Sequence, residues 1–552
     1  MSQATWQDIA SRKRAERDSK IPPEWRISNP VEKGKPIDLI PRCGILTERD
    51  LALTNPIHDA TDLLSQLSSG KVTAEDVIRA FCKRAAVAQQ LTNCFTEIMF
   101  SEAINRAKWL DSEYHRRGKQ PVGPLHGLPI SIKDQFNIKG YDSSLGIASL
   151  CFQPAKTTSQ AVRILLDAGC VIIGKTTVPQ SMLAADTNSI VFGRTVNPYN
   201  AEFAAGGSSG GEGALLAMGG SLLGLATDAG GSARIPAATC GVVGYKSSAY
   251  RIPIDGQRVV GKGVMGITSL GSPTVSGFLA RSVRDVQLAA KVTSDAKPWD
   301  DSPFIYPHPW MGISCPSKPR IGVWLKADDL HLHPPVARGL RLAYDRLKRA
   351  GYEVIELAPP PFQKAWRLSR ELLEVVDLSG LRKLLESEPH TEIVKATDIM
   401  TPKSALRKFT IGYYHELNFQ LARLAMQMKR MWYVDNGKQL DAILFVTAPH
   451  TALPFDKFVW LGFTGIINLL DWSSISIPLN ETVDKKIDAT IIPPDECLSE
   501  LDVSIQKLYD PEKFHGLPLA VQLIGQRFED EKLLAVAEEI APILARRGLT
   551  RL

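Results

Sequence analysis

Residues 206–237 read GGSSGGEGALLAMGGSLLGLATDAGGSARIPA, a stretch that combines many glycines and serines with leucines and alanines suited to a core. A flexible linker does not contain so many apolar side chains, so the stretch is predicted to be buried. Glycines allow positive φ and close approach of other groups. Their consecutive amides can point N–H groups into one concavity that holds negative charge. Serine hydroxyls beside such amides are the parts of an acyl-transfer site, a nucleophile and an oxyanion hole.

A serine nucleophile needs a general base, and the ten histidines include no clear candidate. A neutral lysine can serve instead. Lys133, in LPISIKD (128–134), is the lysine most deeply set in apolar sequence, and burial there disfavours the ammonium form. Lowering its pKa by about 3 units costs on the order of 4 kcal/mol. If the side chain of Asp134 turned back onto Lys133, the lysine would stay charged.

Several motifs resemble the amidase signature family: GLPISIKD (127–134), the long stretch from GGSSGG to CGVVGYK (206–246) and GLPLAVQLIG (516–525). FCKRAAVAQQLTNC (81–94), QPVGPLHGLP (120–129) and FGRTVNP (192–198) are similar to its fungal acetamidase branch. The resemblance covers nearly the whole chain. It implies one large α/β/α domain, with a mixed central sheet covered by helices on both faces. It also implies a Ser–cis-Ser–Lys triad that cleaves amide C–N bonds without a metal or another cofactor.

The resemblance assigns roles residue by residue. Ser232 matches the nucleophile, Ser208 the bridging serine that follows a cis peptide bond, and Lys133 the base. Met182 matches a position that lines the acyl site. The amides that match the oxyanion loop are those of Ala229, Gly230, Gly231 and Ser232. The residues that match supporting positions around the site are Ser209, Thr227, Asp228 and Arg234.

Three alternatives stay open beside an amidase with an acyl-enzyme intermediate. They are an esterase, an acyl transferase on the same triad, and a catalytically silent binding protein on the amidase fold. Ser208 also fits G-x-S-x-G, but that nucleophile elbow requires a preceding strand, and residues 196–207 are not expected to form one. Ala229 stands where the family usually carries a bulkier aliphatic residue, which predicts a looser oxyanion loop or a roomier acyl pocket.

Composition points to an ordinary globular protein, with 552 residues, 44 % hydrophobic residues and a mean hydropathy of -0.07. A net charge of +6 over this length favours neither nucleic acid nor a membrane surface as a partner. The eight cysteines are scattered, and the N-terminus lacks the apolar core of a signal peptide. The most apolar segment, 458–472, is too short to span a membrane and is expected in the core. We therefore expect a cytoplasmic enzyme for a small-molecule amide, with a homodimer as the expected oligomer.

Apolar runs that alternate with helical patterns predict an α/β protein whose sheet is covered on both faces. Strands are expected in 127–138, 319–325, 440–446 and 516–525, and a helix, glycine turn and strand in 160–176. Thr73 is predicted to cap a helix that follows it, and 529–547 reads as an amphipathic helix. Residues 1–55 are predicted to form an N-terminal arm, and residues 56–552 the amidase signature domain.

Overall fold

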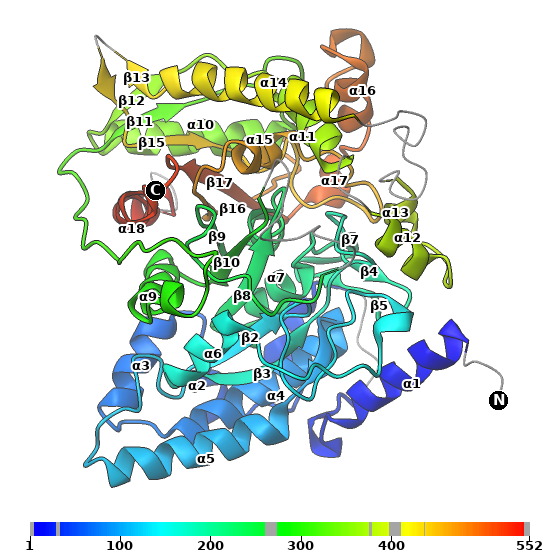
Figure 1. Ribbon diagram of the computed structural model, residues 1–552, viewed down its shortest axis with the longest axis vertical. Helices are drawn as coiled ribbons and strands as arrows, with labels where there is room; N and C mark the ends of the chain where they lie inside the picture. Colours follow the sequence, from blue (N-terminus) through cyan, green and yellow to red (C-terminus); the bar gives the residue numbers. More distant parts are fainter. Residues whose placement is uncertain are drawn as a thin grey trace.

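A mixed sheet of 11 strands forms the centre of the computed structural model, which describes residues 5–28, 34–259, 273–374, 378–396, 410–434 and 437–545 (Figure 1). From one edge to the other the strands are β1 (Phe95–Ile98), β3 (Val171–Thr176), β2 (Pro129–Lys133), β8 (Leu223–Asp228), β10 (Val275–Ala280), β9 (Val243–Lys246), β16 (Ser474–Thr482), β17 (Pro518–Ile524), β15 (Ala442–Phe445), β11 (Arg320–Val323) and β12 (Glu353–Glu356).

Parallel pairing joins β3 to β2 and β2 to β8 on one side of the sheet, and β15 to β11 and β11 to β12 on the other. The strands between β8 and β15 pair antiparallel. In β2, β3, β8 and β10 every residue is buried, as expected for strands covered on both faces. The predicted α/β class with a mixed sheet is confirmed.

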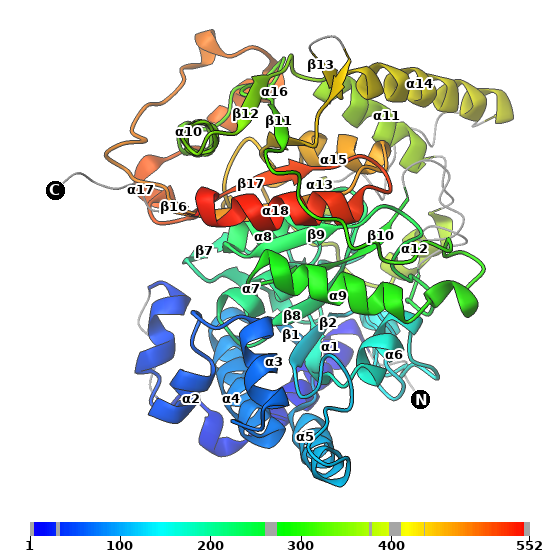
Figure 2. The same cartoon turned by 90° about the vertical axis from the view of Figure 1, so that its left-hand side faces the viewer.

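Helices cover both faces of the sheet (Figures 1 and 2). On one face, α7 (Gly210–Ala217) packs against β8 and α8 (Arg234–Cys240) against β9. On the other face lie α9 (Val283–Asp295) and α18 (Asp530–Leu544). Adjacent residues of β9 mark the two faces, because Gly244 lies against Ala233 and Ala237 while the Tyr245 hydroxyl donates to Asp530.

The remaining helices extend these layers or connect them. They are α1 (Trp6–Ser19), α2 (Glu48–Leu53), α3 (Ala60–Ser68), α4 (Ala74–Thr92), α5 (Phe100–Arg116), α6 (Gln160–Asp167), α10 (Pro334–Arg349), α11 (Phe362–Glu374), α12 (Ser379–Leu385), α13 (Glu392–Ala396), α14 (Ile411–Arg430), α15 (Gly462–Leu469), α16 (Glu500–Gln506) and α17 (Pro511–Phe514), with 3-10 turns at Pro23–Trp25, Pro36–Arg42, Ala148–Leu150, Pro298–Asp300 and Pro494–Glu496.

Most predicted segments have the expected structure. The five predicted strands correspond to β2, β3, β11, β15 and β17, and the helix predicted at 529–547 corresponds to α18. Thr73 caps α4, because its hydroxyl accepts from the Asp76 N–H. The apolar segment 458–472 contains α15, which is buried along its length. Over the described parts of the chain, no helix is both long and apolar enough to cross a membrane.

One prediction about the segment before Ser208 is wrong. Residues 196–207, which were not expected to form a strand, contain β6 (Val196–Asn197) and β7 (Asn200–Ala204). These two short strands pair with each other outside the central sheet, and Phe203 of β7 also forms an isolated antiparallel bridge with Pro454. Similar two-stranded pairs are β4 (Asn188–Ser189) with β5 (Gly193–Arg194), and β13 (Tyr433–Val434) with β14 (Lys438–Gln439).

The N-terminal segment is attached to the sheet edge through buried charges. Lys13 of α1 lies 2.7 Å from a carboxylate oxygen of Glu97 in β1 and 2.8 Å from one of Asp142. Arg17, one turn later, donates to the carbonyl oxygen of Phe95. These contacts hold α1 against the β1 edge. The division into an arm of residues 1–55 and a domain of residues 56–552 stays a prediction.

Candidate active site

Lys133 ends β2 with its amine fully buried among hydroxyl groups. Its Nζ lies 2.8 Å from Ser208 Oγ and 2.8 Å from Thr227 Oγ1. Burial lowers its pKa to about 7, against the attraction of the nearby charges of Asp228, Glu212 and Asp134. A large fraction of the amine is therefore uncharged at neutral pH.

Asp134, the neighbour that was expected to decide the charge of this lysine, turns away from it. Its carboxylate accepts from the Leu145 N–H at 2.6 Å and from the Ser144 hydroxyl at 3.2 Å. Among the ion pairs of the described residues, none joins Lys133 to a carboxylate. The local geometry thus leaves the amine without a direct counterion.

Thr227, at the end of β8, links the lysine to a chain of side-chain amides. Its hydroxyl donates to Gln135 Oε1 at 2.6 Å, and Gln135 Nε2 donates to Gln257. Because the Thr227 proton points to Gln135, its oxygen accepts from the Lys133 amine. The same nitrogen thus lies within hydrogen-bond distance of two hydroxyl oxygens, those of Thr227 and Ser208.

Ser208 lies just before α7 and is buried, and the peptide bond between Gly207 and Ser208 is cis. The neighbouring glycines allow this loop to press against the core. A Cβ on Gly211 would lie 2.4 Å from the Thr177 nitrogen, and one on Gly207 would lie 2.8 Å from the Ala184 carbonyl oxygen. Side chains at these positions would push the loop away from Lys133, which explains the abundance of glycine in a buried stretch.

Ser232 lies on the loop between β8 and α8 and is partly exposed, whereas its direct neighbours Gly231 and Ala233 are buried. Its carbonyl oxygen accepts from the Ser209 N–H at 3.2 Å, so the loop that carries Ser232 lies against the loop that carries Ser208. The Ser209 hydroxyl itself is buried and has no partner among the described residues.

Asp228 and Arg234 form a fully buried ion pair across this loop, at 3.0 Å. The Asp228 carboxylate also accepts from the N–H groups of Gly231 and Ala233. Burial opposes ionisation of Asp228, but Arg234 and the Asn468 amide overcome it and hold its pKa well below the usual range. The pair therefore fixes the curvature of the loop from 228 to 234.

The four amides predicted for the oxyanion loop fall into two groups. The Gly231 N–H donates to Asp228 at 2.8 Å. Within the described parts of the chain, the N–H groups of Ala229, Gly230 and Ser232 have no acceptor, and these three residues are partly exposed. Three amides are thus available to a ligand beside Ser232.

Helix α15 supports the same loop from the other side. The Thr464 hydroxyl donates to the Gly230 carbonyl at 2.5 Å, and Asn468 Nδ2 donates to the Asp228 carboxylate at 2.8 Å. Sequence reasoning missed both residues. The signal was available, since Thr464 and Asn468 lie four residues apart, on one face of an otherwise apolar helix. Gln135, which directly follows the lysine motif, was missed as well.

Met182 is buried and has a positive φ of 64°. It belongs to a small apolar cluster separate from the main core, formed with Leu145, Ile147, Leu150, Val178, Leu378, Leu381 and Leu385. The cluster lies beside Asp134 and its partner loop, because Leu145 is the residue whose N–H binds Asp134.

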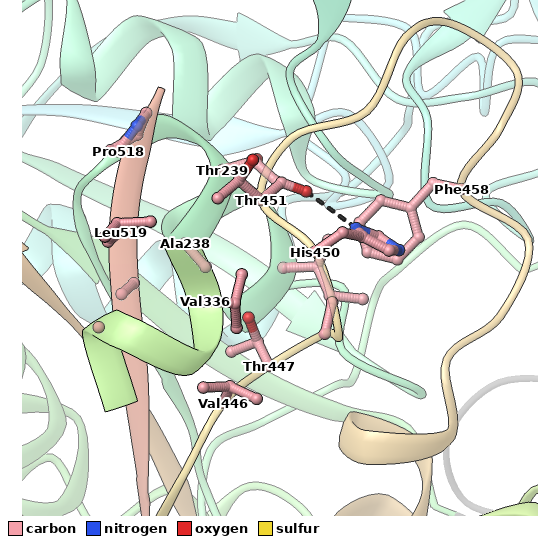
Figure 3. A pocket seen from close by; sticks show the side chains of 14 residues that line it. Ala238, Thr239, Val336, Val446, Thr447, His450, Thr451, Phe458, Pro518 and Leu519 are labelled. Carbon is pink, nitrogen blue, oxygen red and sulfur yellow. Dashed lines mark hydrogen bonds between the residues drawn. The ribbon is translucent and has the colours of Figure 1, made fainter. Parts of the chain in front are cut away.

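A pocket lies against α8, and Figure 3 shows its lining. Its walls include Ala238 and Thr239 of α8, Val336, Phe458 and Leu519. The one imidazole in the lining, that of His450, donates from Nδ1 to the Thr451 carbonyl oxygen. Burial lowers its pKa to about 3, so it is neutral. None of the predicted site residues lines this pocket.

Comparison with known proteins identifies the family of the chain. The family model described as Amidase matches residues 76–534. The chain belongs to the amidase family. It is 34% identical to the acetamidase of Emericella nidulans over 561 residues, which covers 98% of each chain. It is 33% identical to the acetamidase of Aspergillus oryzae over 555 residues, covering 99% of this chain and 100% of that one.

The fold of this amidase family member is also found in a solved fatty acid amide hydrolase. The two superpose with a TM-score of 0.91 at 29% sequence identity, over 98% of this chain and 95% of the other. Family membership and these relatives show that the chain is an amide hydrolase.

Proposed function

We propose that the chain hydrolyses a short carboxylic acid amide through an acyl-enzyme on Ser232, with Ser208 and Lys133 as the proton relay. The observation that carries the proposal is the 2.8 Å hydrogen bond between Lys133 Nζ and Ser208 Oγ, at an amine that forms no ion pair with any described carboxylate. An uncharged amine can accept a proton from Ser208, whereas an ion-paired ammonium cannot.

The reaction begins with transfer of the Ser232 proton to Ser208 and of the Ser208 proton to Lys133. Ser232 Oγ then attacks the carbonyl carbon of the amide. The proton held by Lys133 returns through Ser208 to the departing nitrogen, which leaves as ammonia or an amine. Water attacks the acyl-enzyme along the same relay and releases the carboxylate.

The N–H groups of Ala229, Gly230 and Ser232 are the proposed donors to the oxyanion. Among the described residues these three loop amides have no other acceptor, while the Gly231 amide shapes the loop through Asp228. Removal of one such donor typically lowers the rate about 10²- to 10³-fold. Thr464 and Asn468 hold the loop in the shape that presents these donors.

The proposed substrate class follows from the relatives, which are named acetamidases. We place the acyl group between Ser232 and the cluster that contains Met182. The small side chain of Ala229 leaves room beside the reacting carbonyl, which favours acyl groups somewhat larger than acetyl.

The test compares the wild type with Ser232→Ala on a series of amides of increasing acyl length. Turnover is measured as the release of ammonia. We expect Ser232→Ala to be folded and essentially inactive, and to resist labelling by a fluorophosphonate. Ser221→Ala is the matched control, since Ser221 is a buried serine of the same stretch whose hydroxyl donates to the Leu223 carbonyl oxygen. Wild-type turnover by Ser232→Ala would refute the assignment.

A further inference from the structure

Glu212 is a buried carboxyl group that the proposed relay does not use. It is the third residue of α7 and is fully buried. Its two oxygens accept from the Ser131 hydroxyl at 2.5 Å and from the Thr176 hydroxyl at 2.8 Å. Among the described residues, Glu212 makes no ion pair with a lysine or arginine.

The carboxyl group lies on the same face of the sheet as the Lys133 amine. Ser131 and Lys133 are separated by one residue in β2, so their side chains project to the same side. A Cβ on Gly224 of β8 would lie 2.2 Å from Glu212 Oε2, so the carboxyl is wedged against the strand that leads to Thr227.

Other titratable groups around α7 are accounted for. Burial raises the pKa of the Cys94 and Cys240 thiols to about 12, so both stay protonated. Arg84 of α4 is bound to the Met218 and Thr54 carbonyls. Lys175 of β3 reaches the opposite way, to Ser143. Lys133 is the charged group whose attraction lowers the pKa of Glu212, while the Lys133 amine is attracted first by Asp228 and then by Glu212.

The two groups respond to pH in the same range. Burial raises the pKa of Glu212 to about 7, against the hydroxyl hydrogen bonds and the attraction of Lys133. In turn, the charge of Glu212 works against the lowering of the pKa of Lys133. Above neutral pH the carboxyl is ionised, and the amine beside it is uncharged and ready to accept a proton.

We propose that Glu212 is a positioning residue that stabilises Lys133 in the protonated state the amine reaches when it takes the proton from Ser208. The inference rests on the proposed function. As the proton moves from Ser208 Oγ to Lys133 Nζ, the amine gains positive charge inside a site that excludes water. The Glu212 carboxylate, itself unchanged, offsets that charge as the aspartate of a serine protease triad offsets the charge on its histidine.

The experiment compares the pH dependence of kcat/KM for the wild type and Glu212→Gln, on the best amide of the graded series. Loss of the Glu212 carboxylate should lower the pKa of Lys133 and so weaken it as a base. We therefore expect the acid limb of the kcat/KM profile to move to lower pH by about one unit. The plateau kcat should fall by up to about tenfold, since a base weakened by one unit has tenfold lower proton affinity. Asp285→Asn is the matched control. Asp285 is also a buried carboxyl, but it accepts from the N–H groups of Ala60 and Thr61 and contacts none of the proposed site residues in the hydrogen bonds described.

A purely structural role for Glu212 would lower kcat without moving the acid limb, and that result would overturn the inference. Glu212→Asp keeps the charge and provides a second variant, in which the acid limb should stay near the wild-type position. An acid limb that moves as far in Glu212→Asp as in Glu212→Gln would also overturn it. These outcomes are separate from failure of the proposed function, which an active Ser232→Ala would reveal.

Discussion

Replacing Lys133 with methionine is expected to abolish amide hydrolysis and, at neutral pH, to stabilise the fold. Methionine has a similar length and no charge, so it fills the same buried space. The wild-type lysine is costly to bury, since burial lowers its pKa from 10.5 to about 7. The unfolded chain keeps the ordinary value of about 10.4.

The magnitude follows from that difference. Folding lowers the pKa of Lys133 from 10.5 to about 7, a difference of about 3.5. At about 1.36 kcal/mol per pKa unit, the buried lysine costs the wild-type protein about 5 kcal/mol of stability. The variant gives up two hydrogen bonds, from Nζ to Ser208 and to Thr227, worth about 1 kcal/mol each. We expect Lys133→Met to be about 2–3 kcal/mol more stable than the wild type.

The gain depends on pH in a defined way. Above pH 10.5 the lysine is neutral in both states and costs nothing, and the cost grows as pH falls to about 7, below which it is constant. For 552 residues, an unfolding entropy of about 2.1 cal/mol/K per residue makes 1 kcal/mol worth about 1 °C. The midpoint of thermal unfolding at pH 7 should rise by about 2–3 °C, and the rise should shrink by pH 10.

Lys71→Met is the control, because Lys71 is exposed and its replacement should show no such pH-dependent gain. A Lys133→Met protein that is less stable than the wild type at pH 7, or whose gain is the same at pH 7 and pH 10, would refute the reasoning. Either result would mean that the folded protein holds Lys133 as a charged, well-compensated group.

Two further predictions concern buried charges. Asp228→Asn leaves the fully buried Arg234 without its carboxylate partner, so the free energy of unfolding measured in urea should fall by about 3–5 kcal/mol. Turnover should fall as well. A variant as stable as the wild type would contradict this prediction. Lys13→Met leaves Glu97 and Asp142 without the α1 ammonium, and should release α1 from the sheet edge at a cost of about 3 kcal/mol. Faster tryptic cleavage near the N-terminus is the expected readout, and unchanged protection would rule the attachment out.

Much of the fold could be read from local sequence pattern. Runs of apolar residues, such as those of β3 and β17, are buried strands because both faces of the sheet are covered. Thr73 was predicted to cap α4 because capping depends on residues within one helical turn. The prediction that residues 196–207 contain no strand was wrong. The strand β7 forms because it pairs with β6, and such pairing is not visible in the propensities of the segment itself.

The sequence by itself determined which chemical groups the site could contain, because the spacing of lysine, serines and glycines is local information. Only the tertiary structure decided their charges and partners. Asp134 is adjacent to Lys133 in the chain yet binds Leu145, whereas Thr227, 94 residues away, accepts from the lysine. Charge state depends on burial and on groups brought close by folding, and neither distance nor desolvation is encoded in the order of neighbouring residues.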